Sequence, residues 1–135
     1  MVKKTKTQQT ATNMVIDEQE LVTIPEEDKT FTNLSKKLTE IRKDKDVTGY
    51  IIRNTTSATV DLKDPEKLVE YAIFSSQVLD SSQEILDLFE IGDVRSIFVE
   101  GKENNVICMD IDGNKIAIFM EKDADYANIF NKVSP

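Results

Sequence analysis

The segment from Pro65 to about Phe89 constrains the fold most, because it predicts a long helix with an unusually wide apolar face. At about 100° per residue, its apolar and small side chains fall within an arc of about 160°. A helix that covers one sheet needs an apolar stripe of only about 100°. The wide face is therefore either buried within one domain or shared between a sheet and a partner. The arc contains Leu68, Tyr71, Ala72, Phe74, Ser75, Val78, Leu79, Ser82, Ile85, Leu86 and Phe89.

Two strand patterns precede this helix, at residues 47–53 and 57–62, and three follow it, at residues 94–100, 106–111 and 115–120. The first and last of these strands are apolar on both faces, which indicates interior strands with helices on both sides of the sheet. Asn54-Thr55-Thr56 and Asp112-Gly113 mark tight turns, so the neighbouring strands are expected to pair as antiparallel hairpins. Asp64-Pro65 predicts the helix start, with Asp64 as its cap.

Apolar residues at helical spacing predict two further helices, at about residues 29–43 and 123–133. The predicted order is αββαβββα, an α/β (α+β) domain with a single five-stranded antiparallel sheet. We expect one domain over residues 29–135. Residues 1–28 are expected to be a flexible N-terminal extension, because they are polar and lack a period. Two short apolar patches interrupt that extension, at residues 14–16 and 21–24.

Composition excludes several classes of function. The chain has 25 acidic and 17 basic residues and a net charge of −8, which disfavours nucleic acids and anionic membranes as partners. It has no histidine, so histidine-based catalysis and histidine metal sites are ruled out. No phosphate-binding glycine loop occurs. We therefore expect a protein that is not an enzyme and that uses no cofactor or metal.

Three features with possible chemistry have simpler interpretations. Cys108 is the single cysteine and lies among apolar residues, so it is expected to be a buried thiol. Residues 110–114 superficially resemble a calcium loop, but their glycine comes too early and apolar residues follow, as in a hairpin turn. Arg95 is expected to be an ordinary surface cation rather than an arginine that is inserted into a partner's active site.

The N-terminal residues do not form a secretory signal, and no apolar run is long enough to span a bilayer. The sequence therefore predicts a cytoplasmic protein without membrane insertion.

Five short motifs accompany the element order: Val47-Thr48-Gly49-Tyr50-Ile51-Ile52, Asp64-Pro65, Ile91-Gly92-Asp93-Val94, Asp112-Gly113-Asn114 and Ala127-Asn128-Ile129. With that order, the chain resembles the roadblock family of dynein light chains, which also includes bacterial polarity regulators and lysosomal scaffold subunits. The resemblance covers about residues 30–133. None of the motifs is a catalytic signature. Where the family often has an Asp-Gly turn in its first hairpin, this chain has Asn54-Thr55-Thr56, so the related longin and profilin-like domains stay open.

The resemblance implies a profilin-like roadblock architecture and a non-catalytic scaffold without a cofactor. Family members typically dimerise through the second helix and the neighbouring edge strand, here residues 94–100. A homodimer is expected, with a heterodimer of two roadblock proteins as the open alternative. The expected dimer-interface residues are Tyr71, Phe74, Ser75, Val78, Ser82, Ile85, Arg95, Ile97 and Val99.

Family members commonly serve as platforms for Ras-like small GTPases or as subunits of motor and signalling complexes. We therefore expect an adaptor that binds and regulates a Ras-like small GTPase. The expected contact is an acidic row on the solvent side of the second helix, which would attract a basic patch. The alternatives are that this row is only a solvated face, that the protein is a structural subunit without a GTPase, or that it is a profilin-like or longin-like binding module. The row consists of Glu70, Asp80, Glu84 and Asp87.

Overall fold

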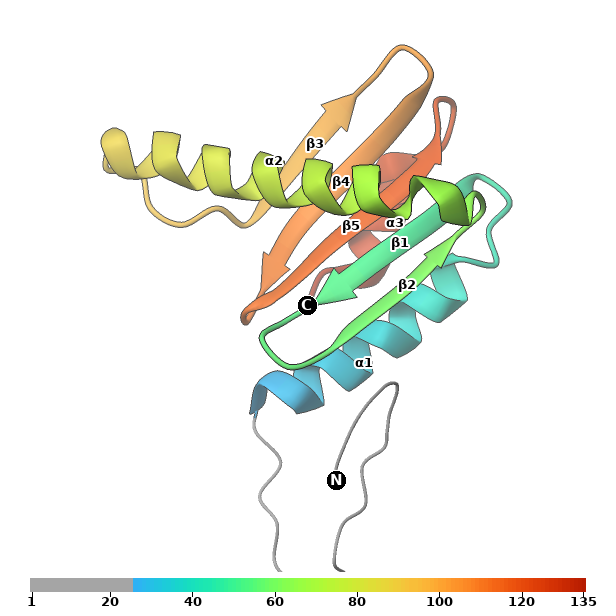
Figure 1. The fold of residues 1–135 in the computed structure, drawn as a ribbon, viewed down its shortest axis with the longest axis horizontal. Coiled ribbons are helices and arrows are strands. Elements are labelled where there is room, and N and C mark those ends of the chain that lie inside the picture. The colour runs from blue at the N-terminus through green and yellow to red at the C-terminus, as the bar shows by residue number, and fades with distance from the viewer. Residues whose placement is uncertain (1–25) are drawn as a thin grey trace, which may run out of the picture.

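A five-stranded antiparallel sheet lies between two helical layers in the computed structural model, which describes residues 26–135 (Figure 1). The long helix α2 crosses one face of the sheet, and α1 and α3 cover the other. The αββαβββα order and the sheet are as predicted. The elements are α1 (Glu26–Ile41), β1 (Val47–Arg53), β2 (Ala58–Leu62), the 3₁₀ turn η1 (Pro65–Lys67), α2 (Leu68–Leu88), β3 (Ser96–Glu100), β4 (Asn104–Ile111), β5 (Asn114–Glu121) and α3 (Tyr126–Val133).

The strands follow the order β2-β1-β5-β4-β3, so β2 and β3 are the two edges. Every pair is antiparallel, and the central strand β5 pairs with β1 on one side and β4 on the other. This confirms that the strands with two apolar faces, β1 and β5, are interior. It also confirms that the strand after the long helix is an edge strand.

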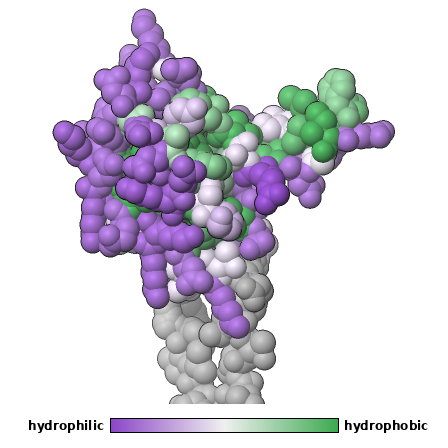
Figure 2. Space-filling model, turned by 180° about the vertical axis from the view of Figure 1, so that it is seen from behind, coloured by the Kyte–Doolittle hydropathy of each residue, from purple (hydrophilic) through white to green (hydrophobic). Residues whose placement is uncertain are grey.

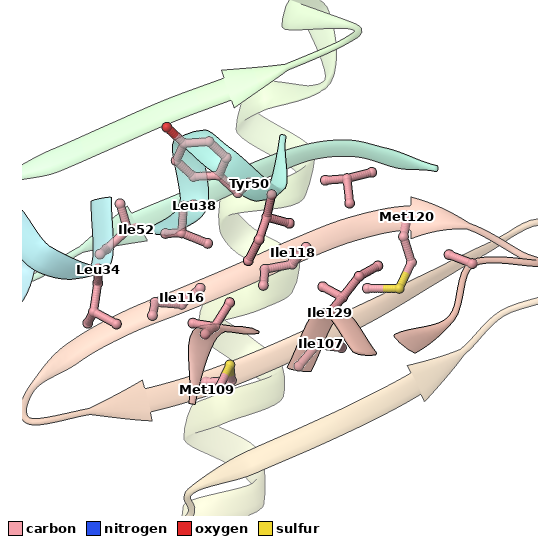
Figure 3. Close-up of a cluster of buried hydrophobic side chains, with 14 residues drawn as sticks. Leu34, Leu38, Tyr50, Ile52, Ile107, Met109, Ile116, Ile118, Met120 and Ile129 are labelled. Atoms are coloured by element: carbon pink, nitrogen blue, oxygen red, sulfur yellow. The ribbon is translucent and has the colours of Figure 1, made fainter. Parts of the chain in front are cut away.

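The larger core lies between the sheet and the layer of α1 and α3 (Figure 3). Leu34, Leu38 and Ile41 recur at spacings of three and four along α1, so one face of that helix is buried. They meet the inward side chains of the sheet, such as Ile52 and Ile118, which are fully buried. These contacts form the larger of the two hydrophobic cores.

The core on the α2 side is smaller. It joins Leu79 to Ile51, Cys108 and Phe119 of the sheet, and Tyr71 stacks on Phe119 with ring centroids 4.3 Å apart. Among the residues of α2, only Ser75 and Leu79 are buried in the described structure. The protein's own sheet therefore covers the wide apolar arc only in part: Tyr71, Ala72 and Val78 pack against this core, whereas Phe74, Ile85 and Phe89 are exposed.

The two hairpin turns use different side-chain chemistry. Asp112 and Gly113 both have positive φ (52° and 84°), the backbone conformation that the predicted tight turn requires. In the first hairpin, the Asn54 carboxamide oxygen accepts from the backbone N–H groups of Thr56 and Ser57, at 2.9 and 2.8 Å. The side chain thus replaces a glycine turn with an Asx turn.

Several boundaries differ from the prediction. Helix α1 begins at Glu26 and ends at Ile41, against a predicted span of 29–43. The long helix starts with a 3₁₀ turn. Asp64 occupies the predicted N-cap position of that turn, but its side chain makes no capping hydrogen bond. Pro65 does occupy the first helical position, where its missing N–H costs nothing. Residues 1–25 of the predicted extension lie outside the described residues, so that assignment stays a prediction.

Candidate protein-interaction surface

The C-terminal end of α2 projects beyond the sheet, past the edge strand β3 (Figure 1). Figure 2 shows apolar side chains gathered on this projecting part. Four large apolar residues there are strongly exposed: Ile85 (57%), Leu88 (76%), Phe89 (67%) and Ile91 (68%). We call these four residues the apolar arm. Exposed apolar clusters of this kind mark interaction sites in folded proteins.

Backbone hydrogen bonds end α2 and fix the shape of the arm. The N–H of Ile91 donates to the carbonyl of Leu86 (2.9 Å), and the N–H of Glu90 donates to the carbonyl of Asp87 (3.2 Å). This pair of bonds defines a Schellman cap, whose left-handed position is usually glycine. Here Glu90 holds that position, with φ 56°. The predicted helix end close to Gly92 is therefore confirmed, although Glu90 makes the turn.

Gln83 fastens the base of the arm to the sheet. Its Oε1 accepts from the backbone N–H of Val94 at 2.8 Å, and its Nε2 donates to the Asp87 carboxylate at 2.8 Å. Val94 lies two residues before β3 begins at Ser96. The arm and the edge strand are thus held in a defined relation to each other.

The predicted interface residues lie along α2 and at the β3 edge, but not all face outward. Phe74 and Ile85 are exposed, and Tyr71 and Val78 are half-buried on the same flank of the helix. Ser75 is only 5% exposed and donates to the Ala72 carbonyl at 3.1 Å, so it packs inside the domain. The remaining residues are half-buried or, for Arg95, exposed: Ser82, Arg95, Ile97 and Val99.

The acidic row lies where it was expected, because Glu70, Asp80, Glu84 and Asp87 are all exposed on the outer side of α2. The helical projection did not reveal two apolar neighbours of that row. Val69 is 68% exposed and Ile73 is 54% exposed. Both residues lie outside the apolar arc, among the acidic residues of the helix. Large apolar side chains at such positions were the signal in the sequence that could have identified this apolar patch.

The residues considered for other chemistry have structural roles. Cys108 is fully buried, as predicted, and burial raises the pKa of its thiol to about 11. Asp110 accepts from the Gly113 N–H (3.2 Å) and pairs with Lys115 (3.2 Å), so it supports the β4–β5 turn. Among the described residues, no group of three or more acidic or cysteine side chains is arranged to hold a metal ion. No helix in the described part of the chain is long and apolar enough to cross a membrane.

The architecture is that of the roadblock fold, and comparison with solved structures supports this directly. A Roadblock/LC7 domain from Streptomyces avermitilis superposes with a TM-score of 0.62 at 17% sequence identity, over 73% of this chain and 86% of that one. Myxococcus xanthus MglB superposes with a TM-score of 0.64 at 11% identity, over 84% of this chain and 86% of its own. No family model matches the sequence, and no curated protein matches it either. The predicted roadblock architecture is thus confirmed as a fold.

Proposed function

We propose that this protein is a non-catalytic roadblock adaptor that forms a homodimer and binds a Ras-like small GTPase in the cytoplasm. The observation that carries the proposal is the apolar arm, which the domain itself leaves uncovered. Four large apolar side chains that are exposed together on a charged protein indicate a surface that another molecule covers.

A second copy is the occupant that fits the arm best. The arm projects past β3, whose outer edge has no neighbouring strand in the described sheet. A copy that paired with β3 would lie directly under the arm, and two-fold symmetry would place its own arm on the first copy. The same contact would cover the exposed flank of Phe74 and Ile85. It would also protect an edge that otherwise risks uncontrolled pairing.

The outer side of α2 remains available for a different partner in such a dimer. Val69 and Ile73 supply apolar contact area there, and the acidic row supplies charge around them. A few apolar residues surrounded by polar ones is the usual composition of a binding hot spot. The motif resemblance to a family that commonly binds Ras-like GTPases favours a GTPase with a basic patch.

Binding assays with small GTPases from the same cell test this function. Isothermal titration with each GTPase, loaded with GDP or a GTP analogue, is expected to reveal binding that weakens as salt is added. The triple variant Glu70→Lys, Glu84→Lys and Asp87→Lys should lose that binding. A charge-matched control, Glu40→Lys, Glu103→Lys and Asp123→Lys, changes exposed acids outside α2 and should retain it.

Unchanged affinity in the α2 triple variant would show that the acidic row is not the contact. If no GTPase from the cell binds the unmutated protein in either nucleotide state, the GTPase proposal fails. The structural-subunit alternative would then take its place.

A further inference from the structure

We propose that two copies pair β3 with β3 in one register, with the two-fold axis beside Phe98, and that Phe98 and Tyr126 of both copies form one aromatic cluster. This inference rests on the dimer of the proposed function and adds the register and a second contact on the opposite face of the sheet.

The free edge of β3 has a defined pattern of hydrogen-bonding groups. The N–H of Asp110 donates to the carbonyl of Arg95 (3.1 Å), and the N–H of Gly101 donates to the carbonyl of Asn104 (3.0 Å). These bonds flank the strand, and backbone direction alternates along an antiparallel ladder. Ile97 and Val99 therefore also direct their backbone groups toward β4. Ser96, Phe98 and Glu100 direct theirs to the free edge.

Symmetry limits the registers that two such edges can adopt. A two-fold axis perpendicular to the sheet keeps every side chain on its own face, and directly opposed residues share a face. The axis must therefore pass beside a residue. An axis beside Phe98 sets Phe98 opposite its own copy and Ser96 opposite Glu100, so every outward N–H and C=O of β3 is paired.

Registers with the axis beside a neighbouring residue leave outward backbone groups of β3 unpaired or set like charges opposite each other. An axis beside Ile97 leaves the outward groups of Glu100 without a partner within β3. An axis beside Val99 does the same to Ser96. An axis beside Glu100 sets two carboxylates opposite each other, which is destabilising. The register centred on Phe98 avoids both problems.

The side chain of Phe98 gives that register an additional contact. Ile97 and Val99 pack on the α2 side of the sheet, so Phe98 lies on the other face. There it stacks on Tyr126 of α3, with ring centroids 4.0 Å apart and an interplanar angle of 18°. Both rings are partly exposed, Phe98 by 36% and Tyr126 by 46%.

Pairing at Phe98 would join the two stacked pairs. Opposed residues in a hydrogen-bonded antiparallel pair have Cα atoms about 5.5 Å apart, well within reach of two phenylalanine rings. The aromatic cluster would then close the seam on the α1 and α3 side, while the apolar arms close it on the α2 side.

Cysteine cross-linking of the full chain tests the register, in a Cys108→Ala background. Under mild oxidation, Phe98→Cys is expected to give a covalent dimer. Ile97→Cys and Val99→Cys are matched controls, because each would lie two residues from its own copy, beyond the limit of about 7 Å between bridged Cα atoms. Ser96→Cys mixed with Glu100→Cys should cross-link only between the two variants. This last pair keeps Phe98 and both sites are exposed, so it does not depend on tolerance of the Phe98 change.

The aromatic contact has its own readout. Phe98→Ala is expected to raise the dissociation constant of the dimer by about tenfold. The control is Val60→Ala on the other edge strand, where the side chain is similarly exposed (39%), and it should leave the constant unchanged.

Two outcomes separate this inference from the dimer itself. A dimer that cross-links through Ile97→Cys or Val99→Cys instead would overturn the register and leave the dimer standing. A protein that is monomeric and cross-links at none of these positions would overturn both.

Discussion

Cys108 illustrates at the scale of one residue how burial sets chemistry. Its thiol pKa is raised from 9.0 to about 11 because the charged thiolate would be desolvated. A pKa raised on folding contributes stability below the unfolded value, and this contribution is lost as pH rises between about 9 and 11. We expect unfolding free energies of the wild type to fall over that range more steeply than those of Cys108→Ala.

Urea melts between pH 7 and pH 11 measure this difference. The other titrating groups are the same in both proteins, so the comparison isolates the thiol. Rapid labelling of native Cys108 by a thiol reagent at pH 8 would contradict the buried assignment.

Glu90 carries a backbone cost that glycine would remove. Its φ of 56° is in the left-handed region, which costs a residue with a side chain about 1 kcal/mol or more. Glu90→Gly is therefore expected to raise the melting temperature by a few degrees, on the scale of about 4–8 °C per kcal/mol. Glu84→Gly, within α2, should instead lower it, because glycine in a helix interior is destabilising by roughly 1 kcal/mol. A fall in both variants would argue against the Schellman cap.

At the scale of elements, α2 presents two separate surfaces that mutations can distinguish. Leu88→Lys with Ile91→Lys places charges in the apolar arm and should abolish dimerisation. Because both residues are exposed, the fold itself should change by at most about 0.5 kcal/mol per site. Val69→Lys with Ile73→Lys changes residues of comparable exposure on the outer side. That variant should remain a dimer and lose GTPase binding.

Circular dichroism, light scattering and titration calorimetry together read out both variants. If the arm variant remains a dimer, the arm is not the dimer contact. If the outer variant becomes a monomer, the two surfaces are not separate.

Most elements were predictable because their signals are local. The interior strands β1 and β5 show apolar residues on both faces, and the Asp112-Gly113 turn follows from backbone preference. The Asx turn at Asn54 was not predicted in its chemistry, since it depends on how one side chain folds back on its own backbone.

The candidate site was only partly predictable. The wide apolar arc indicated a shared face, but a helical projection does not show how far α2 extends past the sheet. That depends on the sheet's width, a non-local property. The small size of Ser75 also did not show whether it faces a partner or its own domain. In the structure it is buried within the domain.

For the whole molecule, the unequal cores of the two layers explain why a second copy is expected. The α1 and α3 layer buries the larger core, whereas α2 covers its face of the sheet only in part and leaves the arm exposed. The arm and the free edge of β3 lie at the same edge of the sheet. One contact with a second copy would therefore complete the α2 layer and occupy the free strand edge together.

The mass of the protein in solution shows whether it is a dimer. Light scattering at micromolar concentration is expected to give twice the 15.3 kDa chain mass for the wild type. The variant with Leu88→Lys and Ile91→Lys is expected to give the chain mass itself. A clean wild-type monomer at that concentration would contradict the account of a dimeric adaptor.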